Sequence, residues 1–485
     1  MSRSDFDDAV AHAKLHFEEG LIRAGFREDG AAWCGPVRRG DGTVEVGVSI
    51  GRGFPFEPPK VNPKDPEAAP WSWHRELDGG LCLIAEDDHD ELWWREPAAF
   101  LEHVGAWLAD ADEGWPNDRP DLDLERYFQQ SSDRRLYLLP DLEPLTDSYV
   151  RFIQGSNGTM GFKSRMEKPV PAVKKFKLDR FGYVATVRSL KVPPRTWEDI
   201  VSMADARVDL GRAVRQGKVD FLILRFERDG QPGAIVLEVG KDANGGIELR
   251  RLLSAGSDAR ARLIRSGPHA ARLAEMRVAI VGVGAIGSYV ADLLVRAGLR
   301  QLTLLDDDIL KPGNVVRHLL DSTAVGLRKV DAVAAELVRR YGIEADDIHR
   351  RGDLVLSDQT AYEVLASHDL VINATAEFQV TALLHAAAQA DGRNFLSVVL
   401  QNNGETLRVD VLPPLGGESL PRSDDALADR PANFEAGCGS PVSPTPPFTV
   451  VEAAAVATRH AVGILVGEPL HPAGEVRHLS RRDDR

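Results

Sequence analysis

The chain has 485 residues, which is too long for one compact core and predicts roughly two to four domains. Hydrophobic residues make up 43% and charged residues 27%, which are the values of a folded globular protein and exclude a disordered chain. The formal net charge of -15 argues against nucleic acid or an anionic membrane as the main partner, because both are bound through clustered Lys and Arg.

The composition along the chain marks neither export nor a membrane span. The N-terminus lacks an apolar signal core, and no run of about 18 apolar residues is free of charge. The three cysteines, Cys34, Cys82 and Cys438, are odd in number and widely spaced, which suits neither a disulfide framework nor a CxxC zinc site. We therefore expect a cytoplasmic protein with free thiols, whose partner is a protein or a small molecule.

Residues 1–125 predict a small α+β domain. The helical spacing of residues 6–26 is followed by strand-like alternation in residues 42–50 and by the proline-rich segment FPFEPPKV. Apolar residues return to helical spacing in residues 97–111, which predicts a closing amphipathic helix.

Residues 126–265 predict a mixed α/β linker domain without a catalytic motif. Short strands are expected in residues 181–190, 219–227 and 233–240, and a helical stretch in residues 197–217.

Residues 266–485 predict a parallel, Rossmann-like α/β domain. The order from residue 277 onward is an apolar strand, a glycine turn, a helix and a second strand. Residues 412–447 are rich in Pro, Gly and Asp, and we expect a long mobile loop there, of a length that is usually functional.

The glycine turn is the strongest local signal for a nucleotide. Gly282, Gly284 and Gly287 form GxGxxG directly after the strand, so that the backbone can approach phosphates at the positive end of the next helix. Asp306 follows nineteen residues after Gly287, at the end of the second strand, where a carboxylate can bind ribose hydroxyls. The alternative is that the glycines serve only tight strand-helix packing.

Downstream polar and cationic residues indicate which nucleotide. Asn314, Arg317 and Lys329 suit a triphosphate that is cleaved, because positive charge stabilises pyrophosphate as it leaves. A nicotinamide-dependent dehydrogenase shares only the glycine turn and Asp306, and it stays an alternative that would prefer NAD over ATP.

These residues resemble the ThiF/MoeB and ubiquitin-activating family of adenylating enzymes, over roughly residues 266–485. The match consists of GxGxxG, Asp-x-Asp, an asparagine with an arginine three residues later, and a lysine that opens a helix. The resemblance implies ATP, Mg²⁺ and a homodimer. It implies catalytic roles for Arg317 and Lys329 and nucleotide binding by Gly282, Gly284, Gly287, Asp306, Asp308 and Asn314.

One segment departs from the family pattern. Where relatives have acids that contact magnesium and ATP, this chain reads LVINATAEF, with Asn373 and Ala376 at the acidic positions. Glu377 is the nearby acid that we expect to contact magnesium.

The family also places a catalytic cysteine in its crossover loop, which here is Cys438, and a thiolate there can attack an acyl-adenylate to give a thioester. A bystander surface cysteine is the alternative.

The first block resembles the catalytic core of ubiquitin-conjugating enzymes. The turn FPFEPP and the segment GGLCL with Cys82 match that family in order, although its His-Pro-Asn element is missing. His74 lies eight residues before Cys82, about where the asparagine of that element would sit, and an imidazole there can polarise a thioester carbonyl. The alternatives are a buried apolar thiol at Cys82 and a histidine that only packs the turn.

With both resemblances in one chain, the protein resembles the bacterial fusion enzymes of CBASS antiphage operons and related ubiquitin-like conjugation systems. They imply that the C-terminus of a partner, a ubiquitin-like protein or a cGAS-like nucleotidyltransferase, is adenylated, captured by Cys438, passed to Cys82 and joined to a lysine amine. A sulfur-carrier or small-molecule adenylating enzyme, which needs no residues 1–125, and a non-catalytic scaffold are the alternatives.

Overall fold

The computed structural model describes residues 3–83, 92–115, 122–169, 179–187, 190–228, 230–242, 244–258, 261, 263–353, 355, 357–422, 433–434 and 441–479. The chain divides into two compact units, Met1–Asp258 and Ala259–Arg485. This division lies a few residues before the boundary expected at residue 265, and the further division of the first unit near residue 125 stays a prediction.

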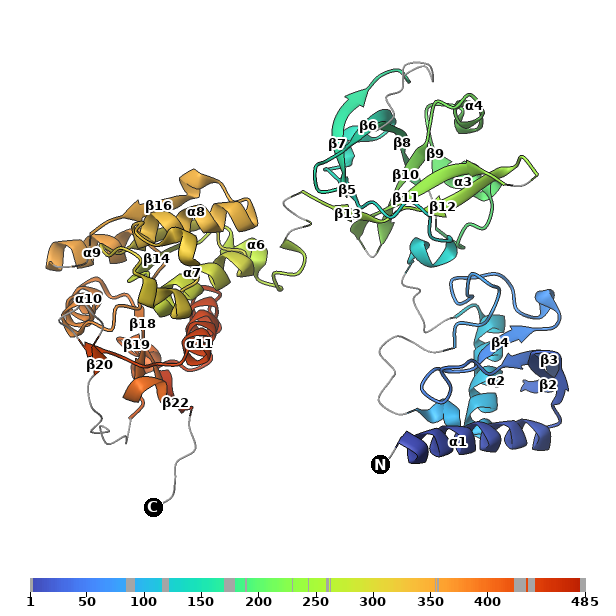
Figure 1. Cartoon of the computed structure of the whole chain (residues 1–485), viewed down its shortest axis with the longest axis horizontal. Coiled ribbons are helices and arrows are strands. Elements are labelled where there is room, and N and C mark those ends of the chain that lie inside the picture. The colour runs from blue at the N-terminus through green and yellow to red at the C-terminus, as the bar shows by residue number, and fades with distance from the viewer. Residues whose placement is uncertain are drawn as a thin grey trace. The chain divides into compact units, whose positions relative to one another are not determined.

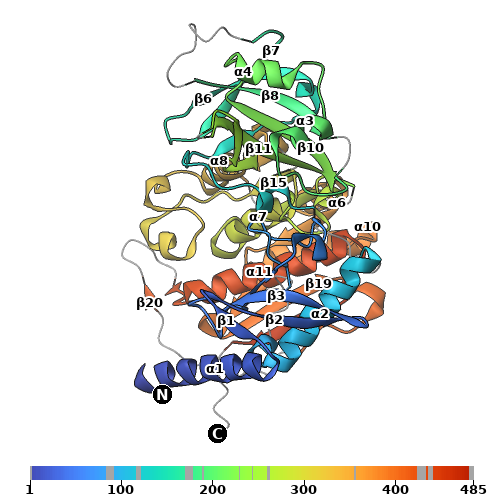
Figure 2. The same ribbon diagram turned by 90° about the vertical axis from the view of Figure 1, so that its right-hand side faces the viewer.

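The first part of the first unit is a helix, an antiparallel meander and a second helix, as the sequence predicts (Figure 1). The elements are α1 (Arg3–Arg23), β1 (Arg27–Asp29), β2 (Ala32–Arg39), β3 (Gly42–Ser49), β4 (Lys60–Pro63), η1 (Pro66–Ala68), η2 (Trp93–Arg95) and α2 (Pro97–Glu113). The four strands pair in the order β1-β2-β3-β4. Side chains of both helices and of the sheet form one apolar core. Figure 2 shows α2 beside β2 of this sheet.

The helix α2 shows why this block packs closely. Proline at its first position and a left-handed glycine, Gly114, after its last residue fix its two ends. Phe100, Val104 and Trp107 recur on its buried face, as the predicted amphipathic spacing requires. At Gly20 of α1 a Cβ would lie 2.1 Å from Cγ of Pro97, so that only glycine lets the two helices approach this far.

The second part of the first unit is built around a nine-stranded sheet with the order β12-β11-β10-β8-β6-β7-β5-β13, in which β9 pairs with β8. Its elements are η3 (Leu124–Tyr127), β5 (Tyr137–Leu139), η4 (Glu143–Leu145), β6 (Ser148–Gln154), β7 (Met160–Met166), β8 (Asp179–Val187), α3 (Trp197–Met203), β9 (Ala204–Asp205), α4 (Leu210–Arg215), β10 (Phe221–Arg228), β11 (Gln231–Lys241), β12 (Ile247–Arg251) and β13 (Ser254–Gly256). The three predicted strands are present as β8, β10 and β11.

The prediction of a single helical stretch over residues 197–217 is wrong. Two short helices form instead, because Ala204 and Asp205 pair with β8 and interrupt the helical backbone. Asp209 then starts α4 afresh by accepting a hydrogen bond from the backbone N–H of Arg212.

The second unit is a three-layer α/β domain, as predicted. Its sheet has the order β16-β15-β14-β17-β18-β19-β22, parallel from β16 to β18 and antiparallel at β19 and β22. Its helices and strands are α6 (Ala270–Leu273), β14 (Arg277–Val281), α7 (Ala285–Ala297), β15 (Gln301–Leu305), η6 (Pro312–Arg317), η7 (Ser322–Ala324), α8 (Lys329–Tyr341), η8 (Ala345–Asp347), β16 (Ile348–Arg351), α9 (Asp358–Ser367), β17 (Leu370–Asn373), α10 (Phe378–Asp391), β18 (Phe395–Gln401), η9 (Asn402–Gly404), β19 (Thr406–Leu412), η10 (Leu415–Gly417), β20 (Asn433–Phe434), β21 (Pro441–Val442), α11 (Pro447–Leu465) and β22 (Gly474–His478).

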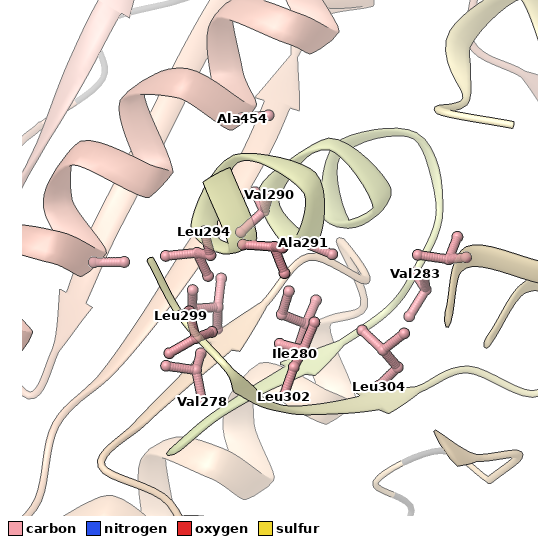
Figure 3. Close-up of a cluster of buried hydrophobic side chains, with 14 of the residues drawn as sticks. Val278, Ile280, Val283, Val290, Ala291, Leu294, Leu299, Leu302, Leu304 and Ala454 are labelled. Carbon is pink, nitrogen blue, oxygen red and sulfur yellow. The ribbon is translucent and has the colours of Figure 1, made fainter. Parts of the chain in front are cut away.

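Apolar helix faces cover both sides of this sheet. On one side α7, α8 and α11 enclose a core to which β14 and β15 contribute Val278, Ile280, Leu302 and Leu304 (Figure 3). On the other side α9 and α10 pack on the alternate residues of the same strands. The helix α11 is long and apolar enough to cross a membrane by length and composition, yet 56% of its apolar window is buried inside this unit.

Candidate functional site

The glycine turn lies where the strand order of the second sheet reverses. The connection after β14 leads to β15 on one side, whereas β17 pairs with β14 on the other, and ligands of open α/β sheets bind at such a switch point. Gly282 has a φ of 88°. Gly284 is the N-cap of α7, and a Cβ added there would meet no atom within 4 Å. A Cβ on Gly287 would lie 1.9 Å from the carbonyl oxygen of Gly282. The turn therefore presents bare backbone at the positive end of α7.

Asp306 binds the backbone of this turn. Its side chain is 6% exposed, and its two oxygens accept hydrogen bonds from the backbone N–H groups of Val283 at 2.7 Å and Asp308 at 2.8 Å. The sequence predicts a ribose ligand at this position. The structure places one carboxylate oxygen on the backbone of the glycine turn and the other on the loop that follows β15, and the contact with ribose stays a prediction.

Asp308 and Lys329 form an ion pair beside the turn. Nζ of Lys329 lies 2.6 Å from Oδ2 of Asp308, and the lysine side chain is only 10% exposed. Burial alone would raise the pKa of Asp308, but the hydrogen bonds from Lys329 and the backbone N–H of Ile309, together with the charges of Lys329 and Lys311, hold that pKa below its ordinary value. Lys329 occupies the first position of α8.

A small pocket gathers the predicted cationic residues. It has a volume of about 80 Å³. Its lining consists of Gly284, Ala285, Asn314, Arg317, His318 and Lys329. Bare backbone at a helix N-terminus together with a lysine and an arginine fits the phosphate end of a nucleotide, so these residues suit the triphosphate that the sequence predicts.

Two of these side chains also make contacts that shape the pocket. Asn314 accepts a hydrogen bond from the backbone N–H of Lys311 at 3.0 Å, which caps η6. Arg317 donates from Nη1 to the carbonyl oxygen of Ser443 at 2.8 Å. The guanidinium thus joins the pocket to the segment that precedes α11.

His318 is a pocket residue that the sequence analysis missed. It is 4% exposed, and burial lowers its pKa, so that it is neutral near pH 7. Its Nδ1 accepts from the backbone N–H of Leu320 at 3.2 Å, so Nε2 carries the proton and donates to the carbonyl oxygen of Val283 at 2.9 Å. No motif marks this histidine, and only its place directly after Arg317 hinted at it.

In the segment expected to contact magnesium, the side chain of Asn373 forms its hydrogen bonds within the protein. Asn373 is 1% exposed, accepts from the backbone N–H and hydroxyl of Thr375, and donates to the hydroxyl of Thr381. Ala376 has a φ of 59°, in the left-handed region that alanine rarely adopts. Glu377 precedes α10 and is exposed. The described residues hold no cluster of three or more His, Cys, Asp or Glu side chains that fits a metal ion, so one carboxylate, Glu377, is the donor that this segment offers to magnesium.

Cys82 is fixed through its backbone in the first unit. Its N–H donates to the carbonyl oxygen of His74 at 2.9 Å, and its carbonyl oxygen accepts from Nε1 of Trp107 at 2.9 Å. The thiol itself is half-buried. These contacts leave the backbone of Cys82 little freedom and direct its side chain toward the residues described next.

Two charged residues that the sequence analysis missed flank the Cys82 sulfur. Nη2 of Arg126 lies 3.0 Å from Sγ of Cys82 and 2.9 Å from Oε1 of Glu76. Burial raises the pKa of the Cys82 thiol above its ordinary value, and the hydrogen bond and charge of Arg126 offset part of that rise. Arg126 lies 44 residues after Cys82, so no local motif joins the two.

His74 turns its ring toward an aromatic pocket. Its imidazole stacks on Trp115, with ring centroids 3.8 Å apart and an interplanar angle of 25°. The pocket has a volume of about 270 Å³. Its lining consists of Pro70, Ser72, Trp73, His74, Ala111, Gly114, Trp115 and Lys191. The role of His74 in place of the family's asparagine stays a prediction.

The other two thiols differ in what the structure describes. Cys34 lies in β2, with Sγ 3.7 Å from Oδ2 of Asp29. Cys438 lies outside the described residues, so its predicted role as the thioester cysteine stays a prediction.

Comparison with known proteins relates most of the second unit to one family. Residues 258–470 match the sequence model of the ThiF family. The uncharacterised protein y4qC of Sinorhizobium fredii is 34% identical over 148 residues, which are 28% of this chain and 25% of that protein. The ATP-dependent ubiquitin transferase-like protein Cap2 of Vibrio cholerae serotype O1 is 34% identical over 131 residues, 26% of this chain and 21% of that protein.

Further matches are more distant. Ubiquitin-like modifier-activating enzyme 5 of Drosophila willistoni is 28% identical over 153 residues, which are 30% of this chain and 37% of that protein. Among solved structures, E. coli MccB is 17% identical with a TM-score of 0.35, over 47% of this chain and 70% of that chain. Such a TM-score adds nothing to the assignment. Each of these curated relatives is matched over well under two thirds of its length.

Proposed function

We propose that this chain, which carries a ThiF-family domain in residues 258–470, activates the C-terminal carboxylate of a protein partner with ATP and then conjugates it. The observation that carries the proposal is the pocket at the switch point, where bare backbone at the start of α7 meets Arg317 and Lys329. The relatives named as ubiquitin transferase-like and modifier-activating enzymes support a protein as the activated substrate.

The residues of the pocket divide the work of adenylation. ATP supplies the leaving group: the partner's carboxylate bonds to the α-phosphorus, and the bond to pyrophosphate breaks. The turn at Gly284 and the N-terminus of α7 bind phosphate oxygens, and Arg317 and Lys329 stabilise the negative charge that develops on pyrophosphate. Asp306 and neutral His318 hold the turn in place from both sides. Glu377 is the residue that we expect to help hold Mg²⁺, which neutralises phosphate charge when bound.

The later steps use the two thiols. Cys438 bonds to the acyl carbon of the adenylate and AMP leaves, which gives a thioester. Cys82 then takes the acyl group by thioester exchange and passes it to a lysine amine. The half-buried thiol and the fixed backbone of Cys82 support this role. We further propose a homodimer and a place in antiphage defence, by resemblance to the fusion enzymes named above.

Intact-mass spectrometry tests the relay on the purified full chain. The chain is incubated with ATP, magnesium and lysate of its own host, and the experiment is repeated with Cys82→Ala and Cys438→Ala. We expect a thiol-sensitive protein adduct that needs ATP, is lost in Cys438→Ala and stays on Cys438 in Cys82→Ala. ATP consumption without an adduct on either cysteine would replace the relay by sulfur-carrier or small-molecule adenylation.

A further inference from the structure

The guanidinium of Arg126 contacts the sulfur of Cys82, although the two residues come from different parts of the first unit. Cys82 follows the predicted conjugating-type turn, whereas Arg126 lies in η3, which leads into the nine-stranded sheet. Nη2 of Arg126 is 3.0 Å from Sγ, within the range of a charge-assisted hydrogen bond to sulfur.

Neighbouring contacts hold η3 in this position. The hydroxyl of Tyr127 donates to the carbonyl oxygen of Trp73 at 2.6 Å, and the two rings pack edge to face with centroids 5.4 Å apart. Asp123 caps η3 by accepting from the backbone N–H of Glu125 at 2.9 Å. Glu125 in turn pairs with Arg251 of β12 at 2.9 Å. The position of the guanidinium is therefore set by packing and by paired charges on both sides of Arg126.

Glu76 competes with Cys82 for the same guanidinium. Its Oε1 lies 2.9 Å from Nη2 of Arg126, and its own backbone N–H donates to the carbonyl oxygen of Gly80 at 2.8 Å. A cation beside a thiol favours the thiolate, and a carboxylate beside it opposes the thiolate. The two residues thus act on the charge of Cys82 with opposite signs.

We propose that Arg126 is a catalytic residue of the Cys82 site, which stabilises the Cys82 thiolate both as attacking nucleophile and as leaving group. The proposal rests on the function proposed above. In the first step the thiolate bonds to the acyl carbon of the incoming thioester, the bond to the donor sulfur breaks, and the donor leaves as a thiolate. In the second step the amine nitrogen bonds to the same carbon, Cys82 leaves as a thiolate, and the amine proton passes to solvent.

The pH dependence of Cys82 reactivity tests this role without any partner protein. In the full chain with Cys34→Ser and Cys438→Ser, Cys82 is the sole thiol, and its reaction with a small aromatic disulfide is followed across pH. Arg126→Gln should raise the midpoint of this profile by about one pH unit, because an adjacent cation lowers a pKa by roughly that amount or more. Below the midpoint the thiolate fraction falls about tenfold while its nucleophilicity rises about threefold, so the rate should fall about threefold.

Matched variants separate this electrostatic role from a structural one. Arg126→Lys should retain part of the effect, and Arg23→Gln on the exposed face of α1 should leave the midpoint where it is. Glu76→Gln should lower the midpoint, which is a shift in the opposite direction. An unmoved midpoint in a folded Arg126→Gln protein would overturn the proposal. If Arg126→Gln does not fold, the sign of the Glu76→Gln shift decides in its place: a lower midpoint supports the proposal, and an unmoved or higher one overturns it.

The outcome stays distinct from that of the relay experiment. A shifted midpoint without any ATP-dependent adduct would overturn the conjugation chemistry and support the effect of Arg126 on the thiol. An adduct on Cys82 that forms at the same rate in wild type and Arg126→Gln would overturn the role of Arg126 and leave the relay standing.

Discussion

Replacing Asp306 by asparagine should unfold the second unit at a lower denaturant concentration. The carboxylate is buried and accepts two backbone N–H groups, that of Val283 in the glycine turn and that of Asp308 in the loop after β15. Asparagine keeps one acceptor oxygen and turns an NH₂ group toward the other N–H. A hydrogen bond to a charged group contributes about 1.5–3 kcal/mol, and a buried donor without a partner costs about 1–3 kcal/mol. We therefore expect the free energy of unfolding to fall by about 3 kcal/mol.

The tryptophans provide an internal reference for this measurement. All eight lie between residues 33 and 197, in the first unit, so tryptophan fluorescence reports the unfolding of that unit alone. Far-UV circular dichroism reports both units. In urea the fluorescence transition of Asp306→Asn should coincide with that of wild type, while part of the dichroism transition moves to lower urea.

The adjacent Asp307 supplies the matched control, because it is exposed and carries the same charge. Asp307→Asn should change the stability by less than about 0.5 kcal/mol, as surface substitutions usually do. Equal losses for the two variants would show that the effect is one of net charge, and the assigned role of Asp306 would be wrong.

Three further predictions concern the second unit. Gly287→Ala should destabilise it by roughly 1–3 kcal/mol in urea unfolding because its Cβ meets the oxygen of Gly282, whereas Gly284→Ala should fold normally and lose nucleotide in equilibrium dialysis with ATP. Ala376→Gly relieves a left-handed alanine and should raise the denaturant midpoint, by at most about 1 kcal/mol because glycine also gains freedom in the unfolded chain; an unchanged or lower midpoint would argue against strain there. Burial lowers the pKa of His318, His368 and His460 below the ordinary value of 6.5, so the unfolded chain binds more protons than the folded one. The stability of the second unit should therefore be full above about pH 6.5 and fall as the pH drops below it. A urea midpoint of the dichroism transition that stays the same between pH 7.5 and 5.5 would contradict this.

The parts of the site that the sequence predicts are those that belong to one motif with a fixed order along the chain. The glycine turn, Arg317 and Lys329 match the order of the adenylating family, and the structure brings these residues to one pocket. Spacing alone also located the strands β3, β8, β10, β11, β14 and β15 and the helix α2, because alternation and helical periodicity reflect which face is buried.

Contacts between distant segments were not predictable in this way. Arg126 reaches Cys82 across 44 residues, and His318 reaches Val283 across 35, and neither pair belongs to a repeated pattern. The hydrogen bond from the backbone N–H of Val283 to Asp306 spans 23 residues and was not predictable for the same reason, and the predicted contact of Asp306 with ribose stays a prediction.

The hydrogen bond from Arg317 to Ser443 has a thermodynamic consequence for the segment that precedes α11. Ser443 lies five residues after Cys438, and its carbonyl oxygen occupies one donor of the guanidinium that lines the phosphate pocket. An anion that draws Arg317 into the pocket weakens this hydrogen bond. By linkage, breaking the hydrogen bond changes the affinity for the anion by the same factor. Anion binding in the pocket and the contact between Arg317 and Ser443 are then linked equilibria, joined by a single arginine.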